Sequence, residues 1–198
     1  VRPPNGPEFT KSDQDFADWF IRKFKLMSRW FNQPQPIDSI TLEINQLMRI
    51  DQFVQTVPAK IAQFFNCRSC DIWKLDKETS KVTKFAKNER CEVDQVLTGI
   101  AGDCMARENT VYCSSNKLHS AYNKNSDGEL DEPVLAIPVK ETDSRFVYSI
   151  VLRGPNESHM FSLNSERTLK RLAPIIILAL TNSEEFTSVD DNFQSSHM

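Results

Sequence analysis

Apolar residues recur at steps of three and four along residues 12–32, which predicts an amphipathic helix. Arg22, Lys23, Lys25 and Arg29 lie outside the apolar stripe, and Trp19 and Trp30 widen the apolar side. The apolar stripe consists of Phe16, Phe20, Phe24, Met27 and Phe31. We expect the proline-rich residues 1–11 to be disordered, and residues 12–37 to form this helix and a linker.

The aromatic helix leaves three hypotheses open, because it carries more aromatic residues than a short helix needs to dock on its own domain. It could pack on that domain, or it could form a homodimer through Phe16, Phe20, Phe24, Met27 and Phe31. It could also bind a membrane surface or another partner, as basic amphipathic helices do.

Helical and alternating patterns follow one another through the rest of the chain. A helical pattern begins after Asp38 or Ser39 and continues to Phe65, and we expect Pro58 to break it or to start a new helix. Further helices are predicted at 99–108 and 163–182. Alternation of apolar and polar residues predicts strands at 70–75, 81–85, 111–113, 134–140 and 145–152.

Two polar stretches interrupt these elements. Residues 114–132 show little periodicity, and so long a loop inside a compact domain is usually a binding loop or a disordered one. Residues 185–198 are acidic and are expected to form a disordered tail. The sequence therefore predicts helices and hairpins around one long loop.

The composition of the chain limits the functions that it can have. The 198 residues fit one domain with extensions, and the net charge of −3 gives no reason to expect nucleic-acid binding. No apolar segment approaches the ~20 residues that span a bilayer, so we expect no membrane association through a spanning helix. Five cysteines without a secretory signal favour reduced thiols in the cytoplasm. Because the chain begins at Val1, we expect an effector domain elsewhere in a longer protein.

No metal site is expected. Cys67 and Cys70 have the spacing of a zinc-binding pair, but no second pair completes such a site. The carboxylates Asp127, Glu129, Asp131 and Glu132 do not have the spacing of an EF-hand loop, so we expect them to belong to a solvated loop.

Residues 38–184 resemble a GAF domain in the order of their elements and in several short stretches. The matching stretches are 50–57, 70–76, Thr98-Gly99-Ile100-Ala101-Gly102, Val134-Leu135-Ala136-Ile137-Pro138-Val139, and 161–182. The resemblance implies an α+β fold, with a central antiparallel β-sheet flanked by N- and C-terminal helices and a ligand-covering loop.

The resemblance also implies a ligand pocket, because in that family a small molecule lies between the sheet and the long loop. The ligand is often a cyclic nucleotide or a tetrapyrrole. The implied pocket residues are Ile100 and Ala101 through backbone groups, Trp73, Phe85 and Ile137 on the sheet face beneath the loop, and Tyr122, Asn123 and Asp127 from the loop itself. Trp73 and Phe85 could equally be ordinary core residues.

Several departures from the family pattern count against a cyclic nucleotide. Asp71 stands where nucleotide-binding members commonly have a small hydroxyl residue, and Ala86 stands where some members read the base with an aspartate. Glu157 and Ser165 replace the lysine and aspartate of a family ion pair. The ligand class therefore stays open.

Thiol catalysis is the enzyme hypothesis that the resemblance raises, because some GAF proteins are free methionine sulfoxide reductases. Cys91 and Cys104 lie about where two family thiols would be sought, but loop 114–132 has no cysteine and Gly102 takes the resolving position. We therefore expect no catalytic residues. The predicted function is a non-catalytic regulatory domain of a cytosolic signalling protein, which binds a small ligand and signals through helices 12–32 and 163–182. The alternative is a ligand-free scaffold for dimerisation or docking.

Overall fold

The computed structural model describes residues 36–47, 49–93, 98–140, 145–156 and 159–195, with side chains omitted at 36, 93 and 190–195. The aromatic helix predicted at 12–32 lies outside these residues. The chain divides into two compact units, Val1–Ser39 and Ile40–Met198, and the second unit carries the fold described below.

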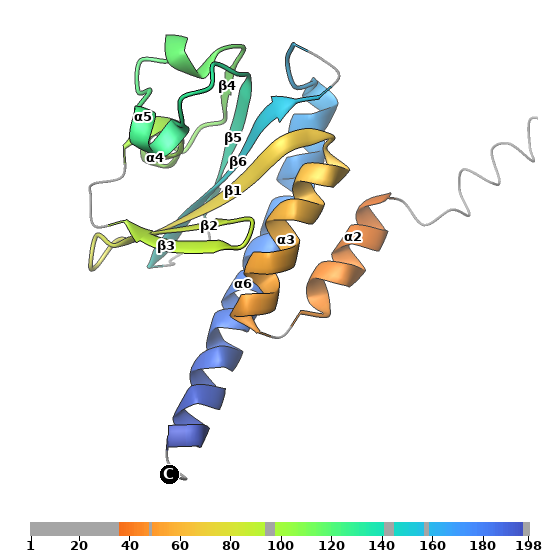
Figure 1. Cartoon of the computed structure of the whole chain (residues 1–198), viewed down its shortest axis with the longest axis vertical. Helices are drawn as coiled ribbons and strands as arrows, with labels where there is room; N and C mark the ends of the chain where they lie inside the picture. The colour runs from red at the N-terminus through yellow and green to blue at the C-terminus, as the bar shows by residue number, and fades with distance from the viewer. Residues whose placement is uncertain (1–35, 48, 94–97, 141–144, 157–158, 196–198) are drawn as a thin grey trace, which may run out of the picture. The chain divides into compact units, whose positions relative to one another are not determined.

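An antiparallel six-stranded sheet forms the centre of the second unit, in the order β3-β2-β1-β6-β5-β4 (Figure 1). Its strands are β1 (Cys67–Asp76), β2 (Val82–Ala86), β3 (Glu89–Val93), β4 (Val111–Cys113), β5 (Val134–Lys140) and β6 (Phe146–Pro155). The predicted strands are all present. The alternation did not reveal β3, because its residues are mostly charged and exposed.

Helices cover both faces of this sheet (Figure 1). The helices are α2 (Pro36–Asn45), α3 (Ile50–Phe64), α4 (Gly99–Arg107), α5 (Lys124–Asp127) and α6 (Leu163–Ser195), with a 3-10 turn η1 at Asn116–Leu118. α3 and α6 pack against each other on one face, and α4 packs on the opposite face over β4, β5 and β6. The predicted α+β architecture is confirmed.

The strand register places on opposite faces of the sheet residues that were expected to share one face. Phe85 lies opposite Ile72, and Ile72 lies opposite Ile150, which in turn lies opposite Ile137. These residues therefore share the face that α3 and α6 cover. Trp73 is the next residue after Ile72 and points to the other face, because successive side chains of a strand alternate. The expectation that Trp73, Phe85 and Ile137 lie together beneath the loop is wrong.

Pro58 does not break its helix as expected. α3 runs through it, and the helical chain is interrupted between Asn45 and Ile50 instead. A proline has no N–H to donate to the carbonyl four residues earlier, which here belongs to Val54. That carbonyl accepts a hydrogen bond from the Asn88 N–H at 3.3 Å. The turn between β2 and β3 thus satisfies the carbonyl that the proline leaves free.

The last helix continues well beyond Asn182, where the sequence predicted its end. The segment 185–198 was expected to be a disordered acidic tail, but α6 extends through it to Ser195. Tertiary contacts explain the difference: the Thr187 hydroxyl accepts a hydrogen bond from the Ile50 N–H at 3.1 Å, and Lys74 pairs with Glu184 at 2.5 Å. These contacts supply stability that the acidic sequence itself lacks.

Removing the Phe85 side chain is expected to destabilise the fold strongly. The ring is fully buried, so Phe85→Ala should lower the free energy of unfolding by about 3–5 kcal/mol. Phe186→Ala is the matched control, because Phe186 is 46% exposed, and it should cost less than about 1 kcal/mol. Urea denaturation measures both. Equal losses would show that Phe85 is not part of the core.

Candidate ligand site

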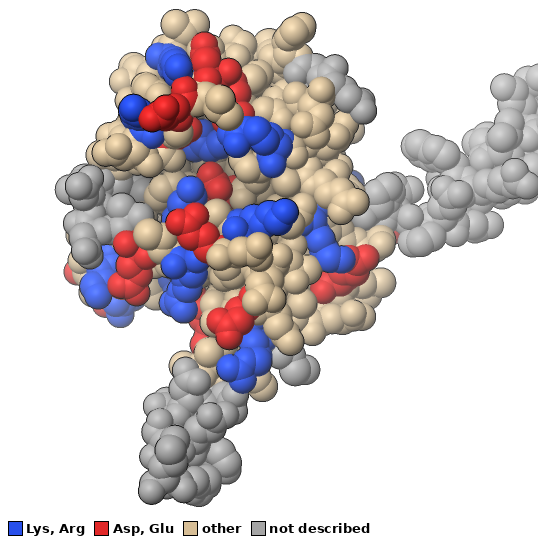
Figure 2. All heavy atoms as spheres, viewed as in Figure 1, with Lys and Arg blue, Asp and Glu red and all other residues tan. Residues whose placement is uncertain are grey.

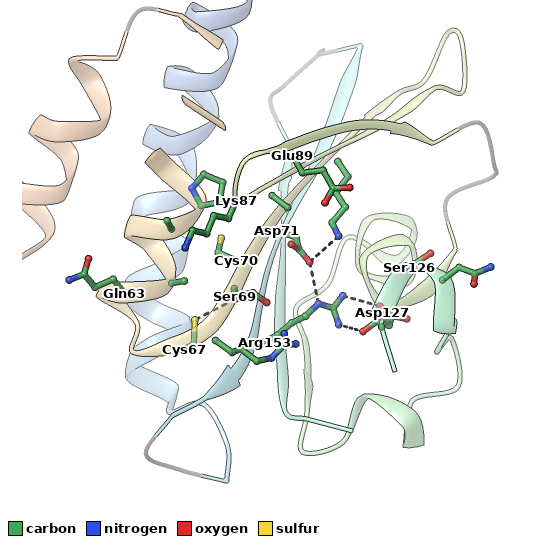
Figure 3. Close-up of a pocket in the computed structure, with 18 residues that line it drawn as sticks. Gln63, Cys67, Ser69, Cys70, Asp71, Lys87, Glu89, Ser126, Asp127 and Arg153 are labelled. Carbon is green, nitrogen blue, oxygen red and sulfur yellow. Dashed lines mark hydrogen bonds and ion pairs between the residues drawn. The ribbon is translucent and has the colours of Figure 1, made fainter. Parts of the chain in front are cut away.

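A pocket of about 580 Å³ lies between α3, the start of β1 and α5 (Figure 3). α3 contributes Pro58, Ala59 and Ala62 to one wall, and the short helix α5 with the following residue contributes 125–128 to the opposite wall. Its volume is that of a typical small-molecule site. The tip of the long loop thus closes one side of the pocket.

The first half of β1 borders this pocket because β2 ends too early to cover it. β2 pairs with β1 over Ile72–Leu75, whereas β1 begins at Cys67 and pairs with β6 along almost its whole length. Residues 67–71 all line the pocket. One edge of this segment therefore faces the pocket instead of a neighbouring strand.

A buried guanidinium joins β6, β1 and the loop beside the pocket. Arg153 is 3% exposed and lies between two carboxylates (Figure 3). Its Nε donates to Asp71 Oδ2 at 3.3 Å, and its Nη2 donates to Asp127 Oδ1 at 3.1 Å. Its Nη1 also donates to the Asp127 carbonyl at 3.1 Å. Because buried charges are costly unless paired and hydrogen-bonded, this arrangement holds the loop against the sheet.

The Asp127 carboxylate also occupies the N-terminus of α4. It accepts hydrogen bonds from the Ile100 N–H at 3.2 Å and from the Asn123 N–H at 2.9 Å. The first turn of a helix leaves N–H groups unpaired and favours negative charge. Gly99 allows the approach: it has a φ of +84°, and a Cβ there would lie 2.7 Å from Asp127 Oδ2. The loop therefore supplies its own anion to this helix.

Loop 114–132 is folded around a second buried polar residue, Asn116. The Asn116 side chain donates to the Leu130 carbonyl at 2.9 Å and accepts from the Glu132 N–H at 3.2 Å. The Glu132 carboxylate pairs with Arg68 of β1. Asn116 thus joins the two ends of the loop to each other, and Glu132 attaches them to the sheet.

Charges of both signs surround the pocket. Lys84 lies 3.7 Å from the Asp71 carboxylate, and Lys87 and Glu89 make no ion pair with a described residue. On the face shown in Figure 2, Lys and Arg are interspersed with Asp and Glu, without a patch of one sign. The exposed ammonium of Lys87 makes the rim near the β2–β3 turn suitable for an anionic group.

Comparison with solved structures identifies the architecture. The GAF domain of a phosphoenolpyruvate-protein phosphotransferase from Coxiella burnetii matches with a TM-score of 0.56 and 19% identity, over 80% of this chain and 95% of that chain. The corresponding GAF domain from Acinetobacter matches with a TM-score of 0.60 and 16% identity, over 79% of this chain and 95% of that chain. The chain has a GAF-like fold.

A third match shows that this fold is also found in an enzyme. The free methionine-R-sulfoxide reductase from Neisseria meningitidis, solved in complex with its substrate, matches with a TM-score of 0.54 and 14% identity, over 75% of this chain and 88% of that chain. Searches of protein-family models and of curated proteins find no match. At these identities the likeness establishes the fold and not an activity.

The GAF-like fold places the predicted ligand residues in four environments. Trp73, Ile100 and Ala101 pack together in the core under α4, and Phe85 and Ile137 are buried on the other face. Tyr122 and Asn123 line a separate groove of about 430 Å³ beside α4. Asp127 lines the larger pocket. The structure therefore brings Asp127 to the candidate site and leaves the other predicted residues outside it.

Three residues at the site were not predicted from the sequence: Arg153, Lys84 and Lys87. Arg153 carried a usable signal, because it ends a strongly apolar strand sequence, Val147-Tyr148-Ser149-Ile150-Val151-Leu152, where an arginine is rarely buried without a partner. Lys84 and Lys87 carried none, since exposed lysines are common in hairpins.

Three of the thiols are too buried to act as nucleophiles. Burial raises the pKa of Cys67 and of Cys104 to about 11, and it raises the pKa of Cys70 well above the usual value. Such thiols stay protonated at neutral pH, and the thiolate is the reactive form. Cys91 is exposed on β3, where it does not line the pocket.

Across the described part of the chain, no group of three or more His, Cys, Asp or Glu side chains has the arrangement of a metal site. Among the described residues, no helix is both long enough and apolar enough to span a membrane.

Gly99 and Gly128 allow a test of the Asp127 contact. Both have φ above +80°, but a Cβ at Gly128 meets open space, whereas one at Gly99 would collide with Asp127. Gly128→Ala should cost about 1–3 kcal/mol from backbone strain. Gly99→Ala should cost at least about 1 kcal/mol more, since it also displaces Asp127 from α4. Thermal unfolding of the two variants compares them, and equal costs would exclude the close packing described here.

Thiol labelling tests the burial of the cysteines. In the folded protein at pH 7.5, iodoacetamide is expected to modify Cys91 rapidly and Cys67, Cys70 and Cys104 only after unfolding, as mass spectrometry can show. Rapid labelling of Cys104 would contradict the structure.

The raised thiol pKa values also predict that the free energy of unfolding falls as pH rises from about 9 to 11, because the thiols of the unfolded chain lose their protons first.

Proposed function

We propose that this chain is a non-catalytic regulatory domain with a GAF-like fold, which binds a small ligand bearing an anionic group in the pocket between α3, β1 and α5. The observation that carries the proposal is that a single pocket touches both the loop tip and α3. A ligand in this pocket would contact both α3, which packs against α6, and the tip of loop 114–132.

α3 provides a path from the pocket to the C-terminal helix. Pro58, Ala59 and Ala62 line the pocket, while other residues of α3 pack against α6. The N–H of Ile50, the first residue of α3, donates to Thr187 of α6. A ligand that binds two positions of α3 with different affinity would shift the position of α6 accordingly. Occupancy would then reach an effector domain attached to this helix.

The loop restricts where an anionic group of the ligand can bind. An anionic ligand cannot use the N-terminus of α4 while Asp127 occupies it, so the Ile100 backbone N–H that the resemblance implied for the ligand is taken in this conformation. Lys84 and Lys87 are the groups that would receive the anion. This arrangement favours a ligand other than a cyclic nucleotide, although cyclic nucleotides remain the ligands suggested by the resemblance.

The proposal that the domain is non-catalytic rests on the protonation state of its cysteine thiols. The cysteines that line the pocket, Cys67 and Cys70, are held protonated by burial, and loop 114–132 contains no cysteine. Thiol chemistry in this pocket would need a thiolate that these residues do not supply at neutral pH. A cytosolic location agrees with reduced thiols.

A ligand-free scaffold is the second candidate, and the packing under α4 favours it. Trp73, Ile100, Ala101, Cys104 and Met105 fill the space between α4 and the sheet. Homodimerisation through Phe16, Phe20, Phe24, Met27 and Phe31 would be the function of such a scaffold, and it remains a proposal.

A thermal-shift titration decides between the two candidates. Cyclic AMP, cyclic GMP, AMP, GMP, citrate and inorganic phosphate are each titrated against the full chain. A specific ligand at one hundred times its Kd should stabilise the fold by about 2.7 kcal/mol. Lys87→Ala should weaken that ligand several-fold, while Lys81→Ala, which lies outside the pocket on the same hairpin, should leave it unchanged. No stabilisation by any of these compounds favours the scaffold.

A further inference from the structure

The edge of β1 that borders the pocket is left bare by a specific packing arrangement. β2 reaches only as far as Ile72 along β1, and the chain then turns away at Lys87 and Asn88. Residues 67–71 continue in strand conformation, pairing with β6 on their other side. In the described part of the chain no strand pairs with this edge on the pocket side.

Pro58 leaves a carbonyl free to bind this turn. The Val54 carbonyl, which has no intrahelical donor because residue 58 is proline, accepts the Asn88 N–H at 3.3 Å. Asn88 adopts a φ of +60°, which reverses the chain at this point. The hairpin is therefore fastened to α3 and leaves β1 uncovered beyond Ile72. The hairpin turn and its contact with α3 thus both lie where the gap in the sheet begins.

The residues that line the gap leave room, here called the slot, for one extended chain. Five strand residues measure roughly 17 Å. Ala59 and Ala62 of α3 form a wall of small side chains, and Ser126 and Gly128 lie in the wall opposite (Figure 3). An uncovered strand edge presents a row of N–H and C=O groups that can pair with another strand. Small residues on both sides leave space for the side chains of that strand.

Charge at the slot favours one kind of occupant. Lys84 and Lys87 lie at the end of the slot where β2 stops, and Lys87 makes no ion pair with a described residue. Asp71 and Asp127 are both engaged by Arg153. The Lys87 ammonium therefore remains available to a carboxylate on the incoming chain, and Lys84, 3.7 Å from Asp71, adds positive charge beside it.

We infer that residues 67–71 bind an extended segment of a partner protein by strand addition, with an acidic side chain of that segment held by Lys87 and Lys84. The inference goes beyond small-ligand binding, and it shares with the proposed function the requirement that this pocket be open. The segment takes the place in the sheet that β2 would occupy if it were longer.

Selection from a random heptapeptide display library provides the probe. The full chain is used as bait, and the enriched peptides are synthesised with a single N-methyl group at each position in turn. Backbone pairing predicts a period of two: methylation at alternate positions should weaken binding at least tenfold, and methylation at the intervening positions should have little effect, because only every second N–H of a strand faces its partner. Hydrogen exchange at 67–71 should slow when peptide is bound.

Substitutions locate the bound peptide. Ala59→Trp fills the slot and should abolish binding, while Ala106→Trp, on α4 outside the slot, should not. Lys87→Glu should weaken an acidic peptide at least tenfold, and Lys81→Glu, which makes the same charge change at the far end of β2, should not. Thermal unfolding confirms that each variant is folded.

The outcomes separate this inference from the proposed function. A library that yields no binder, an N-methyl scan without alternation, or binding that survives Ala59→Trp would overturn strand addition. If a small compound of the thermal-shift panel binds while peptides fail, the pocket is a small-molecule site and strand addition alone is wrong. If peptides bind with the predicted alternation while the small compounds fail, strand addition stands without the small-ligand function.

Discussion

Arg153 connects three segments of this fold that are separated in the sequence. Its guanidinium is buried between Asp71, 82 residues earlier, and Asp127, 26 residues earlier. Taking three charges out of water costs free energy that only complete hydrogen bonding offsets. Each donor described for Arg153 finds a carboxylate or a carbonyl oxygen, and Asp127 receives two further N–H groups. The sheet, the loop and α4 are thereby held in one arrangement.

This arrangement explains why the pocket lies at the edge of β1 and not under α4. Asp127 gives the N-terminus of α4 its anion, and Trp73 with the apolar side of α4 fills the space beneath that helix. The remaining space lies where β2 ends early. Loop residues next to Asp127 form one of its walls, so the ion pairs that close the loop also shape the pocket.

Pro58 of α3 affects the structure on the other side of the pocket. Its missing N–H leaves the Val54 carbonyl to Asn88, and the β2–β3 turn is drawn toward the helix. The same helix packs on α6, whose C-terminal part is ordered through contacts with Ile50 and Lys74. Pocket, hairpin and terminal helix therefore share α3, which is the physical basis for proposing that occupancy is transmitted.

The local sequence pattern was sufficient to predict many helices and strands of this protein. Alternation and helical periodicity predicted β1, β5, β6 and α4, and the order of these elements resembled a GAF domain, because a side chain's burial depends on the period of its own element. The lack of periodicity in loop 114–132 predicted a binding loop or a disordered one, and the resemblance to a GAF domain implied that it covers the sheet. The local pattern could not show that α6 continues past Asn182, since the polar residues there are helical through contacts with α3 and β1.

Tertiary structure decided where the site lies. The register that sets Phe85 opposite Ile72 put Phe85 and Ile137 on the face away from the loop, and a shift of one residue would have done the reverse. The pairing of Arg153 with Asp71 and Asp127 joins three segments whose local patterns say nothing of one another. Periodicity records which side chains are buried, but the partner of a buried charge depends on which distant segments fold together, and only the assembled sheet specifies that.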